Sequence, residues 1–229
     1  MLPTELILNT IKNINPEDLS NICSQNKKMR DICKNNFNII SKYFLDKFQV
    51  DYQDPNNFIY RYHKENIDNF KNGNKWSFDS IFKLYMKMYY EDEIDCENLG
   101  ITSFPIYPNM THFYGNNNKL TTFPIQPKME IFFGDNNKLT SFPVQPKMTH
   151  FYGNNNQLIS FPIQPKMEEF EGDNNQLTSF PIQPNMFAFS GNKNKIKEFF
   201  SQPKLEILSI IGNKNVKIHE QKNLTFTNM

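Results

Sequence analysis

The C-terminal half of the sequence repeats with a strict period of 19 residues, and this period limits the possible folds more than any other feature. One unit reads Met-x-x-Phe-x-Gly-x-x-Asn-x-Leu-x-x-Phe-Pro, for example from Met129 to Pro143. Five successive copies keep these columns in register, which argues against a chance pattern. Such a period is typical of a solenoid, in which each unit buries its apolar residues against the next.

The unit resembles the leucine-rich repeat pattern LxxLxLxxNxLxxL, and the resemblance covers more than half of the chain. It implies a solenoid with short parallel strands on a concave face. Met129 and Phe132 then begin a strand and face the core. Ile131 and Phe133 point to the concave face, because side chains alternate along a strand.

The asparagine of each unit is predicted to turn the chain after the strand. In such solenoids, stacked asparagine side chains satisfy backbone groups that the bend leaves unpaired. The loss of one should therefore cost about 1–3 kcal/mol. The predicted ladder comprises Asn118, Asn137, Asn156, Asn175, Asn194 and Asn213.

Two departures from the family pattern predict how the unit packs. Glycine stands, as at Gly134, where leucine-rich repeats place an aliphatic residue, and we expect phenylalanines such as Phe132 and Phe142 to fill the missing volume. Paired prolines, such as Pro124 and Pro127, exclude a helix from the return segment, which should run as polyproline II on the convex side. This arrangement resembles the short repeats of bacterial effector leucine-rich proteins, although those carry one more residue per turn.

The concave face is predicted to bind a protein, since aromatic residues ringed by polar groups are typical of interface hot spots. Plain surface variation is the alternative, because solvent-facing strand positions are free to vary. The candidate binding residues are His112, Tyr114, Asn116, Ile131, Phe133, Asp135, His150, Tyr152, Asn154, Glu169, Glu171 and Asp173.

Catalytic, metal and cofactor sites are not expected. His112 and His150 occupy the same repeat position two units apart, so about 10 Å should separate their Cα atoms, which is long for a shared zinc ion. The glycines follow the repeat period and form no phosphate-binding loop. We therefore expect a protein that is not an enzyme and uses no cofactor.

The first 90 residues contain only three prolines and carry apolar residues at helical spacing, which predicts helices. The segment from Leu2 to Arg30 resembles an F-box, through the pattern LPxEL...I..L.P.DL..L. F-boxes are short helical modules that dock on the Skp-type adaptor of cullin-RING ubiquitin ligases. The resemblance implies an adaptor-facing or core role for Leu2, Pro3, Leu6, Ile11, Ile14, Pro16, Leu19 and Ile22.

Two functions follow from this organisation, and the sequence leaves both open. In the first, the chain is a substrate-recruiting F-box and leucine-rich repeat subunit of a ubiquitin ligase, which binds a host adaptor and a target protein. In the second, it is a non-enzymatic scaffold whose N-terminal helices only cap the solenoid. The whole chain, rich in Asn, Lys and Ile, resembles F-box and leucine-rich repeat proteins of mimivirus-like giant DNA viruses.

Composition narrows the partners and the compartment. A net charge of +1 gives no electrostatic reason to expect nucleic acid or an anionic membrane as partner. No apolar run approaches the roughly 18 residues of a membrane span, and the first residues lack the pattern of a secretory leader. Three cysteines without a CxxC pair suit a reducing compartment. We expect an intracellular, cytoplasmic monomer.

The expected fold class is α+β, a small N-terminal helical domain followed by a leucine-rich repeat solenoid. Residues 1–45 form the F-box-like module, and residues 46–90 form a helical linker or N-terminal cap. Residues 91–213 form about six repeats. Residues 214–229 are predicted to be a C-terminal tail that caps the stack poorly or is disordered.

Overall fold

The computed structural model describes Asp31 and residues 91–228. The chain divides into two compact units, Met1–Glu91 and Asp92–Met229. The predicted F-box-like module and helical cap lie outside the described residues, apart from Asp31. Within the described part of the chain, no helix has the length and apolar character needed to cross a membrane.

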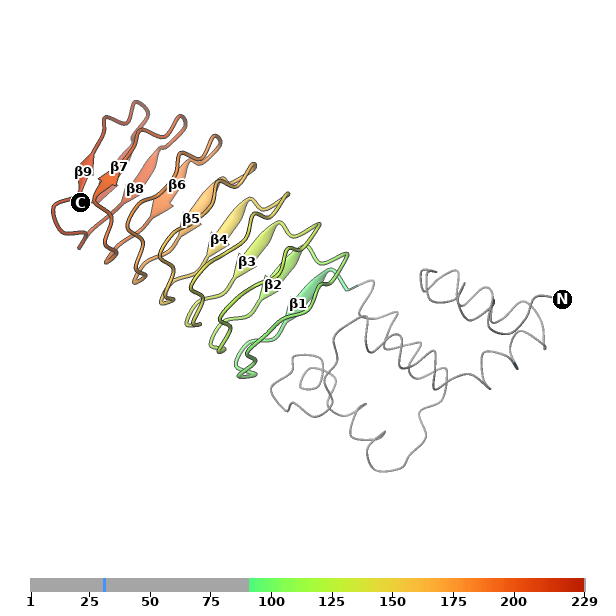
Figure 1. The fold of residues 1–229 in the computed structure, drawn as a ribbon. Coiled ribbons are helices and arrows are strands. Elements are labelled where there is room, and N and C mark those ends of the chain that lie inside the picture. Colours follow the sequence, from blue (N-terminus) through green and yellow to red (C-terminus); the bar gives the residue numbers. More distant parts are fainter. Residues whose placement is uncertain (1–30, 32–90, 229) are drawn as a thin grey trace. The chain divides into compact units, whose positions relative to one another are not determined.

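Eight short parallel strands form one sheet, in which each residue pairs with the residue 19 positions further along the chain. Figure 1 shows successive coils stacked along one axis, with a strand at the same place in each. This confirms the predicted parallel-strand solenoid. The strands, in sheet order, are β1 (Glu93–Asp95), β2 (His112–Tyr114), β3 (Ile131–Phe133), β4 (His150–Tyr152), β5 (Glu169–Glu171), β6 (Ala188–Ser190), β8 (Ile207–Ser209) and β10 (Phe226–Asn228).

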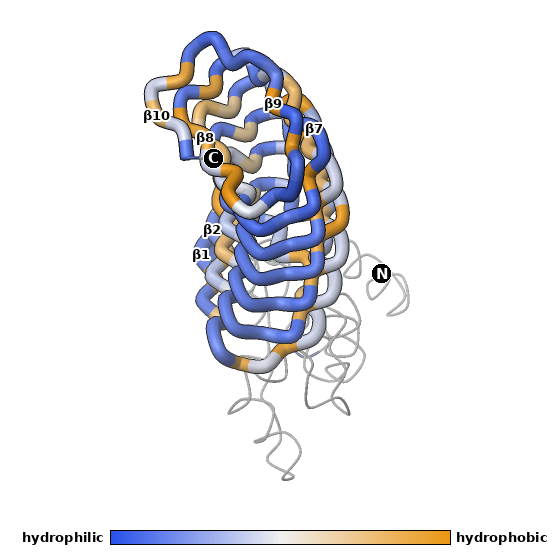
Figure 2. Tube along the Cα trace, turned by 90° about the vertical axis from the view of Figure 1, so that its left-hand side faces the viewer, coloured by the Kyte–Doolittle hydropathy of each residue, from blue (hydrophilic) through white to orange (hydrophobic). Residues whose placement is uncertain are grey.

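Two further strands, β7 (Glu198–Phe199) and β9 (Lys217–Ile218), pair in parallel as a separate small sheet. Figure 2 shows them on the other side of the coil from β1, β2, β8 and β10. They belong to the return segments of the last turns. His219 stands there in the column of the first return proline, and its backbone N–H donates to the Phe199 carbonyl at 2.9 Å.

The core consists of columns of identical apolar side chains, as the repeat predicts. Phe132, at the centre of β3, is fully buried and stacks on Phe151 of the next turn at a ring-centroid distance of 5.2 Å. Phe142 of the return segment meets Phe132 edge-on at 4.7 Å. Two phenylalanine columns therefore interlock along the solenoid, and each ring gains both stacked and edge-to-face neighbours.

The glycine column exists because the strand phenylalanine bends over it. A Cβ atom placed on Gly134 would overlap Cε1 and Cζ of Phe132, and the same holds for Gly153 beneath Phe151. This confirms the predicted exchange of volume for the strand phenylalanine. In the turn of β8, Leu208 and Ile210 replace the phenylalanine and the glycine, and both are buried. Leucine is shorter than phenylalanine, so it leaves room for a side chain two residues later.

A tight turn follows each strand and uses the left-handed backbone conformation. The φ angle is 56° at Asn136 and 52° at Lys193. Asparagine adopts this region more readily than most residues, because its short side chain can hydrogen-bond locally. This explains why the residue before the ladder asparagine is itself asparagine in most turns.

The C-terminal segment is ordered, which contradicts the predicted alternative of a disordered tail. Residues 214–228 form no loose tail but continue the solenoid, since β9 pairs with β7 and β10 pairs with β8. The 19-residue step persists in the hydrogen bond from the Gln202 N–H to Oε1 of Gln221, at 2.8 Å. The apolar pattern does not predict this turn, because its core positions lack Phe and Met, although hydrogen bonding keeps the register.

The return segments contain a second amide ladder, which the sequence analysis missed. Oε1 of Gln145 accepts a hydrogen bond from the Gln126 N–H at 2.8 Å, and its Nε2 donates to the Pro124 carbonyl at 3.0 Å. A glutamine between two prolines in four successive units was the available signal, because an exposed return position has no reason to repeat one polar residue. The ladder comprises Gln126, Gln145, Gln164, Gln183 and Gln202, all buried.

Candidate protein-binding face

The asparagine corner holds successive turns together and so positions the strands. Oδ1 of Asn156 accepts from the Leu139 N–H at 2.9 Å, and its Nδ2 donates to the Gly134 carbonyl at 2.9 Å. All six ladder asparagines repeat these two bonds and are only 6–8% exposed. Each side chain thus bridges its own turn to the preceding one, which fixes the strand spacing.

Three side chains in each turn point away from the core on the side of the main sheet, and we call this surface the strand face. They come from the first and third residues of each strand and from the position two residues beyond. In β2 to β5 each is half-buried, while the central strand residue is buried. All twelve residues predicted to bind a protein lie on this face.

Aromatic rings stack across the middle of the strand face. The rings of Tyr114 and Phe133 lie 5.1 Å apart at 8° to one another, and those of Phe133 and Tyr152 lie 4.7 Å apart at 6°. His112 stacks beside Tyr114, and His150 beside Tyr152, with centroids 6.4 and 6.3 Å apart. Three turns therefore contribute a continuous stack of nearly parallel rings, which we call the aromatic slab.

The two histidines do not approach each other. β3 lies between β2 and β4, and it presents Ile131 at the equivalent position. The Nδ1 atoms of His112 and His150 instead lie 2.9 and 2.8 Å from the hydroxyl groups of Thr111 and Thr149, each one residue earlier. Within residues 91–228, no three His, Cys, Asp or Glu side chains gather as metal ligands.

Three carboxylates, Glu169, Glu171 and Asp173, follow the aromatic slab on the next turn. Burial, together with the charge and hydrogen bond of Glu169, raises the pKa of Tyr152 to about 12. Burial also raises the pKa of Glu171, against a hydrogen bond from Asn154 that lowers it, and the neighbouring carboxylates Glu169 and Asp173 raise it further. Nε2 of His150 lies 3.8 Å from Glu169. This row thus concentrates three carboxylates, of which Asp173 accepts hydrogen bonds from Ser190 and Asn192.

The strand-face residues two positions beyond each strand also stabilise the solenoid, which the repeat pattern did not predict. Oδ1 of Asn116 accepts from the Asp135 N–H at 2.8 Å, and Oδ1 of Asp135 accepts from the Asn154 N–H at 2.7 Å. The same bond joins Asn154 to Asp173, and Asp173 to Asn192. Asn and Asp alternate here because either one supplies the oxygen, while alternation keeps like charges apart. These predicted binding residues therefore also link the turns.

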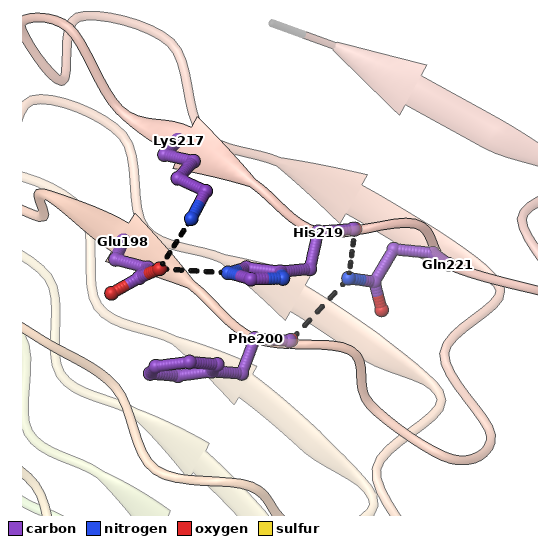
Figure 3. A network of polar contacts seen from close by, with 5 residues as sticks. All are labelled: Glu198, Phe200, Lys217, His219 and Gln221. Carbon is purple, nitrogen blue, oxygen red and sulfur yellow. Dashed lines mark hydrogen bonds and ion pairs between the residues drawn. The ribbon is translucent and has the colours of Figure 1, made fainter.

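Other reactive side chains in the described region occupy structural positions. Burial raises the pKa of the Cys96 thiol, which therefore stays protonated in the core. At the other end of the solenoid, Glu198 lies 2.8 Å from Nε2 of His219 and 3.1 Å from Nζ of Lys217, as Figure 3 shows. Hydrogen bonds from His219 and Lys217 lower the pKa of Glu198. This network joins β7 to β9 and the segment after it.

Comparison with known proteins agrees with this geometry. No family model matches the sequence, and no curated protein matches it. Among solved structures, the leucine-rich effector protein YopM from Yersinia pestis is similar, with a TM-score of 0.50 and 19% identity over 85% of this chain. The fold is a leucine-rich repeat fold. At this identity the likeness concerns the fold alone, and the leucine-rich repeat chain described here covers 59% of the length of YopM.

Proposed function

We propose that this leucine-rich repeat protein is an interaction scaffold that binds a protein ligand on its strand face. The observation that carries the proposal is the aromatic slab of Tyr114, Phe133 and Tyr152 on a sheet face that no other described element covers. Half-buried aromatic rings bordered by histidines and carboxylates supply both the apolar centre and the polar rim of a typical interface.

The variation along the face supports the same proposal. Interior columns repeat one residue type, whereas the first strand position reads His112, Ile131, His150, Glu169 and Ala188 in successive turns. A face that only completes the fold would tolerate such variation too, and this remains the competing explanation. The two explanations differ in whether removing the slab changes binding.

A matched pair of triple variants tests the proposal in the full chain. Tyr114→Ser with Phe133→Ser and Tyr152→Ser removes the slab. Ile125→Ser with Val144→Ser and Ile163→Ser removes exposed aliphatic side chains from the return segment, as a control of similar hydrophobicity. Proteins captured from host cells by the wild type and by the control, but not by the slab variant, support the proposal. Identical capture by all three contradicts it.

We further propose the more specific role of a substrate-recruiting subunit of a ubiquitin ligase, in which residues 1–45 bind a Skp-type adaptor. The F-box-like pattern from Leu2 to Ile22 favours this role, and an intracellular location follows from it. In the competing proposal, the N-terminal residues only cap the solenoid and bind nothing.

Adaptor binding separates these two proposals. The variant Leu2→Ala with Pro3→Ala and Leu6→Ala should lose a host Skp-type adaptor that the wild type retains in a pull-down. The slab variant serves as the control, because it leaves residues 1–45 unchanged. Absence of adaptor binding by the intact protein at micromolar concentration would reject the ligase role and leave the interaction scaffold in place.

A further inference from the structure

We propose that the strand face binds an extended basic segment of a partner protein, with two cationic side chains about six residues apart and an apolar or aromatic side chain between them. The proposal rests on the proposed function and names the chemistry of the partner. It derives from the distribution of charge over the solenoid and from the spacing of its acidic rows.

Charge is strongly segregated in the described region. Residues 91–228 contain fourteen acidic residues and twelve lysines, and they contain no arginine. Seven of the acidic residues lie on the strand face, but none of the lysines does. The net charge of this region is therefore near zero, while the strand face carries only negative charges, in the turns of β1, β3 and β5. Such a face attracts cations and repels phosphate groups, so it favours a basic peptide over nucleic acid.

The negative charge is concentrated in two rows that border the aromatic slab. One row, Glu93, Asp95 and Glu97, lies on β1 and the turn after it, and the other, Glu169, Glu171 and Asp173, lies on β5 and its turn. The slab occupies β2, β3 and β4 between them. Within residues 91–228, no lysine forms an ion pair with either row.

The distance between the rows sets the spacing of the partner's charges. Four strand spacings separate β1 from β5, which amounts to about 19 Å. An extended chain advances about 3.3 Å per residue, so about six residues along the solenoid axis connect the two rows. The side chains two and four residues after the first cation point to the same side as both cations, so one of them can pack against the edges of the stacked rings of the aromatic slab.

The electrostatic state of the second row supports this occupant. The crowding of Glu171 by Glu169 and Asp173 helps to raise the pKa of Glu171. A bound ammonium or guanidinium group would relieve that repulsion. Beyond β5 the face carries Ala188, Ser190 and Ile207, which offer no charge, so the acidic surface ends there.

Two synthetic peptides of identical composition test the spacing. Gly-Lys-Ser-Phe-Ser-Ser-Ser-Lys-Gly places its lysines six residues apart, with the Phe on the same side, whereas Gly-Ser-Ser-Phe-Ser-Lys-Ser-Lys-Gly places them two apart. Each carries the same fluorescent label, and binding to the full chain is followed by anisotropy at low ionic strength. We expect the widely spaced peptide to bind at least about fivefold more tightly, and to weaken as salt increases. Equal affinities would overturn the proposal, as would absence of binding.

Charge-neutral variants test the assignment of the rows. Glu169→Gln with Glu171→Gln, and separately Glu93→Gln with Asp95→Asn, should each weaken the widely spaced peptide about three- to tenfold. Neutralising lysines outside the face, Lys119→Gln with Lys138→Gln, should not weaken binding. Because Gln and Asn keep shape and hydrogen-bond acceptors, circular dichroism should report unchanged folding. Unchanged peptide affinity in both acidic variants would overturn the proposal.

Failure here is distinguishable from failure of the proposed function. A natural ligand that depends on the slab but binds the acidic variants as well as the wild type would overturn the basic-segment proposal alone. Concentration-dependent self-association that the Glu169→Gln and Glu171→Gln changes abolish, without peptide binding, would assign the face to a second copy of this chain. That outcome, measured by sedimentation, would overturn it as well.

Discussion

The interior of the solenoid and its strand face follow opposite rules, although adjacent residues of the same three-residue strands supply both. Phe151 is one of five successive buried phenylalanines. Its neighbours His150 and Tyr152 differ from the residues at the same positions in both adjacent turns. An interior side chain must fit identical rings on both sides, so a substitution in one turn disturbs the packing of three turns. An outward side chain meets solvent and is free to acquire a binding role.

Truncating one interior ring should have the largest effect. Phe151→Ala removes a fully buried side chain that stacks on two turns, and we expect it to lower the free energy of unfolding by about 3–5 kcal/mol. Tyr152→Ala, one residue later on the face, should cost about 1 kcal/mol or less. Urea denaturation of both variants measures the difference. Equal losses would contradict the division between interior and face.

The two asparagine columns offer a second comparison, because one is buried and the other half-exposed. Asn156→Ala leaves the Leu139 N–H and the Gly134 carbonyl unsatisfied in the core, and we expect a loss of about 2–3 kcal/mol. Asn154→Ala exposes the Asp173 N–H to water and should cost about 0.5–1 kcal/mol. Thermal melting ranks the pair, and a reversed order would refute the buried ladder as the stronger link between turns.

The last turns suggest a compensating exchange within the interior. Leu208 and Ile210 replace the Phe and Gly of other turns, so Phe151→Leu with Gly153→Ile should recover part of the stability that Gly153→Ile alone destroys. We expect a favourable coupling of about 1–2 kcal/mol in a double-mutant cycle. Additive losses would show that the Gly153 position needs glycine for a reason other than the ring of Phe151.

The smallest expected effect concerns charge on the face. Because the pKa of Glu171 is raised in the folded protein, its ionisation opposes folding. The carboxyl group therefore favours the folded state at pH below its ordinary value of 4.5, and this contribution disappears as pH rises through the folded pKa. Glu171→Gln should raise the melting temperature slightly at pH 7, and the gain should vanish near pH 4. A gain that persists in acid would contradict this origin.

Much of the architecture was predictable because the same residue types recur every 19 positions, in the core, in the turns and beside the strands. The period predicted the stacking, the alternation around Phe132 predicted the buried and outward sides, and Gly134 beside Phe132 predicted an exchange of volume. The final turn escaped prediction, because Thr227 and Ile218 occupy its core columns and the apolar pattern stops while the backbone pairing continues. The glutamine ladder escaped because a polar residue between prolines looks like an exposed turn.

The sequence alone determined the coil length, the parallel stacking and the identity of the core columns, because each depends on a residue type that recurs every 19 positions. Only the tertiary structure decided how the outward residues combine. Tyr114, Phe133 and Tyr152 are 19 residues apart in sequence and become one stacked surface only when the turns align. The two acidic rows likewise acquire a fixed separation only through the sheet. The physical reason is that the periodic interior fixes the distance between turns, whereas the surface chemistry depends on which side chains of different turns become neighbours.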